Sequence, residues 1–305
     1  MTTDNRASTD LTASGPQVAA SPDSFLSFAD ELVAFGRAQA AELEGSQQSY
    51  LLSHFTDRRI LAGELRLVKE YSRWIPRGAT VLDWGCGPAL PSLALRRFRP
   101  DLQLKAANFD MGIQTYSVLW GKAGVSVDPL RHPWLLPYPD NSLDVVISKG
   151  VLEHVPHEQL SLAEVYRVLR HEGLLIVTGL PATYSLVEWF NRRVKRPHHP
   201  RLYTLGGTKR LLLSCGFQVI WSAFRCACPL ATPWADPLFR VWERTPLFRH
   251  LTQNIAVLGI KSTHGMGDPA FFNHNIPALF NRLQSAQVSH TLPPEKQAEQ
   301  AADSK

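Results

Sequence analysis

Short apolar runs alternate with segments of helical periodicity along most of this 305-residue chain. From residue 80 onward, each run is followed by a turn and then by apolar residues spaced three or four apart, the period of one helix face. Strands separated by helices in this way favour a parallel sheet that is covered on both faces. We expect the strands at Val81–Leu82, Leu102–Asp110, Val125–Asp128, Asn141–Ser148, Leu174–Leu180, Phe217–Phe224 and Ile255–Lys261.

Helical spacing also marks the segments around these strands. Two amphipathic helices are expected before residue 80, and the segment 47–54 lies between them. A further helix should precede the fifth strand, and another should end at Gly216. The apolar positions that define the first three are Phe25, Phe28, Ala29, Leu32 and Val33; Ile60, Leu61, Leu65, Val68 and Tyr71; and Leu162, Val165, Val168 and Leu169.

The two ends of the chain differ in composition from the middle. Residues 1–22 are rich in Thr, Ser, Ala and Asp, and the tail from Gln287 is polar. Neither end can bury enough apolar surface to offset the entropy of ordering, so we expect both to be disordered. No apolar run approaches the ~20 residues of a membrane span, and no apolar segment follows the first residues. We therefore expect a cytoplasmic, soluble protein.

Composition favours one main domain with appendages, since 44% of the residues are hydrophobic and 19% are charged. The formal net charge of +5 is modest for this length and identifies no partner by itself. The four cysteines lack the spacing of a zinc site, so we expect reduced thiols. They are Cys86, Cys215, Cys226 and Cys228.

The clearest candidate chemistry lies in Thr80–Pro91. A buried strand leads to Asp83 and then to a loop with Gly85 and Gly87, and Pro91 opens the next helix. Such a turn presents backbone N–H groups and the positive end of a helix dipole to whatever lies above it. This arrangement suits a nucleotide or nucleoside, although glycines in a lone motif often only make a turn.

The third glycine decides between two kinds of ligand. A dinucleotide loop needs a glycine where this chain has Leu90, so a pyrophosphate site is disfavoured. The loop instead resembles the Asp-x-Gly-x-Gly loop of the class I S-adenosylmethionine-dependent methyltransferases. That family usually has a glycine at the position of Ala89. We expect a negative φ there, which would still let the backbone approach a ligand.

A second motif strengthens this resemblance. The segment 136–146, followed by Val-Leu-Glu-His-Val at 151–155, is similar to a small-molecule subgroup of these enzymes. That subgroup includes the ubiquinone and menaquinone biosynthetic enzymes and many natural-product and sugar methyltransferases. The two motifs extend the resemblance from about residue 50 to about residue 225.

The resemblance implies a Rossmann-like α/β fold: a seven-stranded, mostly parallel sheet with an antiparallel last strand and helices on both faces. It also implies a division of the chain. The parts are a disordered tail (1–22), an N-terminal helical cap (23–75), an S-adenosylmethionine-binding methyltransferase domain (76–262) with an acceptor or lid region (184–250), and a C-terminal extension (263–305).

The same resemblance implies which residues bind the cofactor, S-adenosyl-L-methionine. Asp110 matches the acid that holds its ribose, although a carboxylate there is also a common helix cap. Asp128 matches the acid that contacts adenine, but it stands about one helical turn further from Leu136 than the family pattern expects. Tyr50 and His54 either cover the cofactor or simply pack at the surface. The full set of cofactor residues is Asp83, Gly85, Gly87, Asp110, Met111, Asp128 and Ser148.

Missing motifs narrow the acceptor. Enzymes that methylate exocyclic or amide nitrogens often have an Asn/Asp-Pro-Pro-Tyr turn after the fourth strand, and this chain has residues 148–150 there instead, which disfavours N-methylation of bases and glutamine. Cytosine C5 methylation needs a nucleophilic cysteine, and no cysteine lies between Cys86 and Cys215. Transfer to oxygen or carbon of a small-molecule, sugar or lipid-like acceptor is left as the leading class, and the residues do not decide between oxygen, carbon and nitrogen. His154 is the candidate general base, or else it only holds its loop. Glu153 could join it on a metal, but two ligands do not make a metal site.

Two segments bear on partners. Residues 191–201 carry five basic residues and no acid, which is typical of a solvated loop but would also suit a phosphate or anionic head group. This run is too short and too poor in aromatics to predict nucleic-acid binding. Residues 229–250 mix aromatics, arginines and prolines. They would suit core packing, a lid over the acceptor, or contact with a membrane surface.

Two other functions stay open at the level of sequence. The chain could be a nicotinamide dinucleotide-binding oxidoreductase, or a catalytically silent protein that binds the nucleoside as a scaffold. The residues do not identify the acceptor or the oligomeric state.

Overall fold

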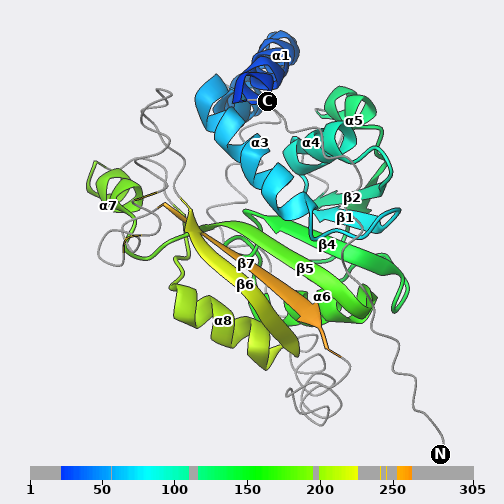
Figure 1. Ribbon diagram of the computed structural model, residues 1–305. Coiled ribbons are helices and arrows are strands. Elements are labelled where there is room, and N and C mark those ends of the chain that lie inside the picture. The colour runs from blue at the N-terminus through cyan, green and yellow to red at the C-terminus, as the bar shows by residue number, and fades with distance from the viewer. Residues whose placement is uncertain are drawn as a thin grey trace, which may run out of the picture.

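A seven-stranded sheet forms the centre of the computed structural model (Figure 1), which describes residues 22–55, 57–109, 116–194, 199–225, 241, 245 and 253–262. The strand order is β3-β2-β1-β4-β5-β7-β6. The strands are β1 (Thr80–Trp84), β2 (Gln103–Phe109), β3 (Val127–Leu130), β4 (Leu143–Lys149), β5 (Leu169–Pro181), β6 (Phe217–Arg225) and β7 (Asn254–Lys261).

Helices cover both faces of this sheet. The apolar core on one face is shared with α1 to α5, and the core on the other face is shared with α6 and α8. Figure 1 shows α7 apart from both layers, at one end of the sheet. The helices are α1 (Pro22–Ala40), α2 (Gly45–Phe55), α3 (Arg58–Ser72), α4 (Leu90–Phe98), α5 (Ser117–Ala123), α6 (Glu158–Val168), α7 (Leu186–Arg193) and α8 (Leu205–Ser214). None of the described helices is long and apolar enough to cross a membrane.

Strand direction follows the predicted fold. β1 pairs in parallel with β2 and β4, and the parallel ladder continues to β3 on one side and β5 on the other. β7 lies between β5 and β6 and is antiparallel to both. The prediction of a mostly parallel seven-stranded sheet with an antiparallel last strand is therefore confirmed.

Alternate side chains of each strand enter different cores. In β1, Val81 packs with the N-terminal helices and Leu82 packs with the cluster that includes α6, and both are fully buried. Strands buried on both faces read as continuous apolar runs, which is why β1 and β4 were recognisable. The carboxyl ends of β1, β4 and β5 share one edge of the sheet, and the candidate site lies there.

Three details differ from the prediction. Three helices, not two, precede β1, because residues 45–55 are themselves helical. The third strand begins at Val127 rather than Val125, since Gly124 ends α5 in the left-handed conformation and Val125 still packs with the helical core. Leu169 begins β5 and is not part of α6, and its backbone is already extended.

Candidate functional site

Backbone hydrogen bonds fix the glycine loop between β1 and α4. The N–H groups of Gly85 and Cys86 both donate to the carbonyl of Ala107 in β2, at 2.8 and 3.1 Å. The buried Trp120 indole donates to the carbonyl of Gly87 at 2.9 Å. Gly85 has φ 66° and Gly87 has φ 45°, conformations that glycine adopts without steric cost. The loop is therefore held to its neighbours on both sides.

Ala89, which follows this loop, overturns one expectation. Its φ is 58° and its ψ is 35°, so the backbone is left-handed and the prediction of a negative φ was wrong. The residue is fully buried at the start of α4, and its N–H donates to the carbonyl of Cys86 at 2.7 Å. A left-handed alanine costs roughly 1–2 kcal/mol, which the surrounding loop must offset. The chain thus keeps the backbone shape of the usual glycine at this position.

The two loop glycines lie against different neighbours. A Cβ on Gly85 would come within 2.7 Å of the Val151 side chain, in the loop after β4. A Cβ on Gly87 would lie 3.1 Å from the hydroxyl oxygen of Tyr50, in α2. Gly85 is therefore required by packing within the protein. Gly87 instead faces the Tyr50 hydroxyl of α2.

Asp83, the last carboxylate before the loop, binds the helix that follows. Its Oδ2 accepts hydrogen bonds from the backbone N–H and the hydroxyl of Ser92, at 3.2 and 2.7 Å. Burial raises the pKa of this carboxyl to about 6, and the Ser92 hydrogen bonds work in the opposite direction. Asp83 thus fastens β1 to the first turn of α4.

Aromatic rings from two elements cover the loop. Tyr50 of α2 lies with its ring 4.6 Å from that of His54 and 5.9 Å from that of Tyr116, which precedes α5. His54 Nδ1 is 2.9 Å from the carbonyl of Tyr50, so the two side chains are ordered together. Burial is the main cause of the lowered His54 pKa and of the raised Tyr50 pKa. α2 therefore places the half-exposed Tyr50 beside the glycine loop. That Tyr50 and His54 cover the cofactor stays a prediction.

Polar side chains gather where β4 and β5 end. Ser148 and Thr178 are fully buried, and neither hydroxyl has a hydrogen-bond partner within the described part of the chain. Lys149, the last residue of β4, forms an ion pair with Glu64 of α3 at 3.4 Å. Buried hydroxyls without partners are uncommon in native proteins and mark places where a ligand or water completes the bonding.

His154 lies in the loop between β4 and α6. It is solvent-exposed, and its ring lies 6.2 Å from that of His199, the residue where the described chain resumes after α7. Partial desolvation, followed by the charges of His199 and Arg201, lowers the pKa of His154. Its neighbour Glu153 is buried, with a raised pKa caused chiefly by burial, and its Oε2 has no partner among the described residues.

His199 has the stronger anchoring of the two rings. Its Nδ1 lies 2.7 Å from Oε1 of Glu188, and its backbone N–H donates to Oε2 of the same carboxylate at 3.3 Å. Since the carboxylate can only accept, Nδ1 carries the proton and the lone pair of the neutral ring lies on Nε2. A buried carboxylate that orients an imidazole in this way is the arrangement by which proteins prepare a general base.

Local sequence explains why Glu188 is available for this bond. Ser185 caps α7, and its hydroxyl accepts from the N–H of Glu188, as in a capping box. In a complete capping box the glutamate would return a bond to the Ser185 N–H, but that group donates to the carbonyl of Ala182. The Glu188 carboxylate therefore turns to His199. The Ser-x-x-Glu pattern was visible in the sequence, but it indicates only a helix start.

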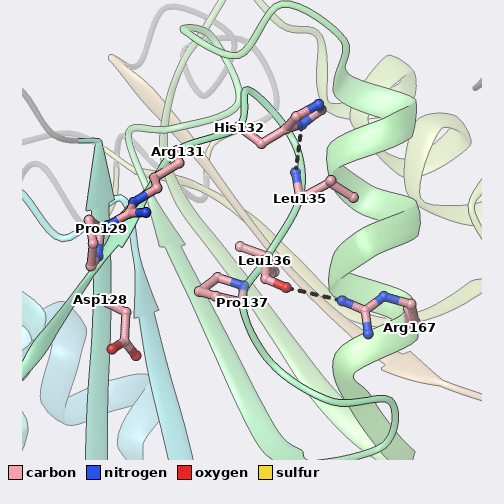
Figure 2. A pocket seen from close by; sticks show the side chains of 8 residues that line it. All are labelled: Asp128, Pro129, Arg131, His132, Leu135, Leu136, Pro137 and Arg167. Carbon is pink, nitrogen blue, oxygen red and sulfur yellow. Dashed lines mark hydrogen bonds between the residues drawn. The ribbon is translucent and has the colours of Figure 1, made fainter. Parts of the chain in front are cut away.

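Asp128 lines a hollow between β3 and α6, shown in Figure 2. It is the second residue of β3, not the last, and it accepts a hydrogen bond of 2.8 Å from the Tyr138 hydroxyl. Burial and this carboxylate raise the pKa of Tyr138. The hollow has a volume of about 640 Å³ and is lined by Asp128, Pro129, Arg131, His132, Leu135, Leu136, Pro137 and Arg167. His132 Nδ1 lies 3.4 Å from the Leu135 N–H inside it.

The remaining cofactor predictions are Asp110 and Met111, which lie outside the described residues. So do most of residues 229–250 and all of the extension from residue 263. Within the described ranges, no three His, Cys, Asp or Glu side chains are grouped so that they could hold a metal ion.

The chain was compared with models of protein families, and one of them matches the segment that holds this site. Residues 82–177 match the family model described as Methyltransferase domain, a segment that contains the glycine loop and the second motif. This match and the strand order both agree with a class I methyltransferase domain. The resemblance read from the sequence is therefore confirmed.

The matches to individual relatives cover only part of each protein. Sterol 24-C-methyltransferase of Pneumocystis carinii is 28% identical over 177 residues, which are 52% of this chain and 45% of that protein. The enzyme of the same name from Saccharomyces cerevisiae is 24% identical, with 57% and 48% covered. Phthiotriol/phenolphthiotriol dimycocerosates methyltransferase 1 of Mycobacterium ulcerans is 37% identical over 79 residues, with 22% and 29% covered. The chain matches about half the length of the sterol relatives.

Solved structures support the fold alone, because their sequences are distant. A chain in the complex of the Haloferax volcanii Trm112 methyltransferase activator with a methyltransferase has a TM-score of 0.54 at 17% identity, covering 74% of this chain and 97% of its own. A SAM-dependent methyltransferase from Thermotoga maritima has a TM-score of 0.51 at 18% identity, covering 74% and 100%.

Proposed function

We propose that the protein is an S-adenosylmethionine-dependent methyltransferase that acts on a lipid-like acceptor. The observation that carries the proposal is the glycine loop, whose left-handed residues at positions 85, 87 and 89 turn the chain between β1 and α4 and leave Gly87 facing Tyr50 of α2. The family match covers this same loop. The sterol and dimycocerosate names of the relatives support a lipid-like acceptor, and the sterol names favour carbon over oxygen as the methylated atom.

The residues present fit the cofactor. Gly87 has no side chain where the loop faces Tyr50, and the partnerless Ser148 hydroxyl lies at the end of the neighbouring strand. In this proposal the loop backbone and Ser148 hold the methionine part, and Asp110 with Met111 holds the ribose. Asp128 stays a proposed adenine contact. When bound, the cofactor supplies a methyl group that is already strongly electrophilic.

The protein's own task is then to orient the acceptor and to take up a proton. An acceptor that gains the methyl group would also lose a proton, and a base of the protein would accept that proton. His154 was the base expected from sequence. We propose His199 instead, because Glu188 fixes its tautomer and leaves Nε2 as the accepting atom. His154, 6.2 Å away between ring centroids, then has a supporting role.

A direct experiment tests this function. The purified chain is incubated with methyl-labelled cofactor and a total lipid extract, and the lipids are separated and identified by mass spectrometry. We expect one lipid class to gain a single labelled methyl group. Calorimetric titration with S-adenosylmethionine and, in parallel, with a nicotinamide dinucleotide separates the alternatives. Dinucleotide binding alone would contradict the proposal, and cofactor binding without any labelled product would favour the silent scaffold.

A further inference from the structure

α7 exposes most of its large apolar side chains. Trp189 is 61% exposed, and Tyr184, just before the helix, is 63% exposed. The other exposed apolar residues of this segment are Leu186, Val187, Phe190 and Val194. Single exposed apolar residues need no explanation, but six within residues 184–194 form a continuous surface of the kind that marks an interaction site.

Helix geometry shows which way this surface points. Leu186, Phe190 and Val194 follow one another at intervals of four residues, so they lie in one row along the helix. Glu188 is the buried residue of α7, and it is bonded to His199, which follows the helix in the chain. The helix is thus anchored through Glu188, and its apolar row is turned outward. Figure 1 shows α7 beyond the end of the sheet, away from both helix layers.

Positive charge accompanies the apolar row. Arg192 and Arg193 stand in the last turn, and the Arg193 guanidinium lies 5.9 Å from the centre of the Trp189 ring. The acid of this helix, Glu188, is buried and paired. The exposed surface of α7 therefore combines aromatic and aliphatic side chains with arginines, without an exposed acid in that helix.

We propose that α7 is an interfacial helix that binds the surface of an anionic lipid bilayer. Trp and Tyr side chains favour the boundary between head groups and acyl chains, because one part of each ring system is apolar and another is polar. Arginines beside them are attracted to anionic head groups. A short helix with an apolar row and a basic end lies in the plane of that boundary. This surface differs from the 229–250 segment that the sequence suggested for membrane contact.

The position of α7 connects this surface to the proposed reaction. Ser185, the N-cap of α7, lies four residues after β5 ends, and residues 182 and 203 form a bridge beside that end. α7 therefore starts beside the carboxyl end of β5, and Glu188 bonds it to His199. A helix bound to a bilayer would hold this edge at the lipid surface, where a lipid-like acceptor is found. This consequence rests on the proposed function, whereas bilayer binding itself does not.

The test uses the full chain and vesicles, with no cofactor or acceptor added. Vesicles of phosphatidylcholine alone, and of phosphatidylcholine mixed with phosphatidylserine, are floated through a density gradient. We expect flotation with the anionic vesicles, weakened by salt. Leu186→Gln combined with Trp189→Gln should weaken binding by at least about tenfold, since two apolar side chains no longer enter the boundary. Arg193→Glu should weaken it by about fivefold or more.

Matched variants elsewhere serve as controls. Trp74 and Leu213 are exposed to a similar extent, 45% and 50%, so Trp74→Gln combined with Leu213→Gln should leave flotation unchanged, as should Arg210→Glu. Absence of flotation with either vesicle, or equal loss in the control variants, would overturn the proposal. So would a wild-type dimer that the α7 variants convert to a monomer, because α7 would then be an interface between two copies. Labelled-methyl transfer, measured separately, can fail while flotation succeeds.

Discussion

At the β1 end of the site, shape is set by main-chain conformation. Three left-handed residues within five positions turn the chain, and main-chain hydrogen bonds to Ala107 hold the turn. At the β5 end, shape is set by side chains that meet across the sequence: Glu188 reaches His199 eleven residues later, and Arg201 donates to the carbonyl of Leu152 at 2.8 Å.

The two ends of the site therefore suit two different ligands. A loop of main-chain groups suits a ligand that is always the same, because its N–H groups and φ angles leave little freedom for variation. A cluster of side chains on a helix and a loop suits the part of the site that differs between acceptors. The comparison predicts that substitutions at the β1 end change cofactor binding or folding, and that those at the β5 end change turnover.

Removing the His199 ring should have the largest effect. His199→Ala is expected to lower turnover by ~10²–10⁴ as a general base is lost, with cofactor affinity close to wild type, because the ring is bonded to Glu188 and not to the glycine loop. Turnover measured across pH and calorimetry with the cofactor check both parts.

The matched control is the neighbouring ring. His154→Ala should lower turnover far less and should leave the pH-rate profile in place. If His154→Ala instead abolishes an inflection below about pH 6.5, where its lowered pKa would place it, the base is His154 and the assignment to His199 is wrong. Glu188→Gln should give an intermediate loss, since the amide still contacts the ring but carries no charge.

The two loop glycines should respond differently to a side chain. Gly85→Val places a branched side chain against Val151 in a left-handed residue, so we expect a loss of about 3 kcal/mol or more in the free energy of unfolding. Gly87→Ala should lose less, about 1–2 kcal/mol for a left-handed alanine, and should bind the cofactor more weakly, because its methyl lies against the Tyr50 hydroxyl. Urea denaturation and calorimetry separate the two effects. Equal stability of both variants would remove the contrast.

Asp83 predicts how stability depends on pH. Its folded pKa of about 6 lies above the unfolded value of about 3.9, so the folded state holds this proton more tightly. Its contribution is greatest below about pH 4 and is lost as pH rises to about 6, a change of about 2–3 kcal/mol against the folded state. Urea denaturation at several pH values should show that Asp83→Asn removes this component. An identical pH dependence in wild type and variant would contradict it.

The smallest effect is expected at the proposed ribose contact. Asp110→Ala should weaken cofactor binding by about 1.5–3 kcal/mol through the loss of charged hydrogen bonds, and Asp110→Asn should lose less. Calorimetric titration measures both. Affinities within a factor of two of wild type in both variants would make Asp110 a helix cap only.

The same contrast between local main-chain patterns and long-range side-chain contacts explains which features the sequence predicts. Strands buried on both faces and a loop with two glycines are local patterns, so the sheet and the turn after β1 were predictable. The sign of φ at Ala89 was not, because a small residue does not reveal the conformation that its neighbours impose. The approach of the Tyr50 hydroxyl to Gly87 and the bond from Glu188 to His199 join distant positions, and a single sequence holds no signal for such pairs.

Glu188 belongs to two structures at once, the first turn of α7 and the hydrogen bond that orients His199. A bilayer that immobilises α7 therefore also restricts the imidazole, and the entropy of ordering that ring is lost before the acceptor arrives. Thermodynamic linkage makes the effect mutual: an acceptor held at Nε2 must strengthen attachment to the bilayer by the same factor by which the bilayer strengthens acceptor binding.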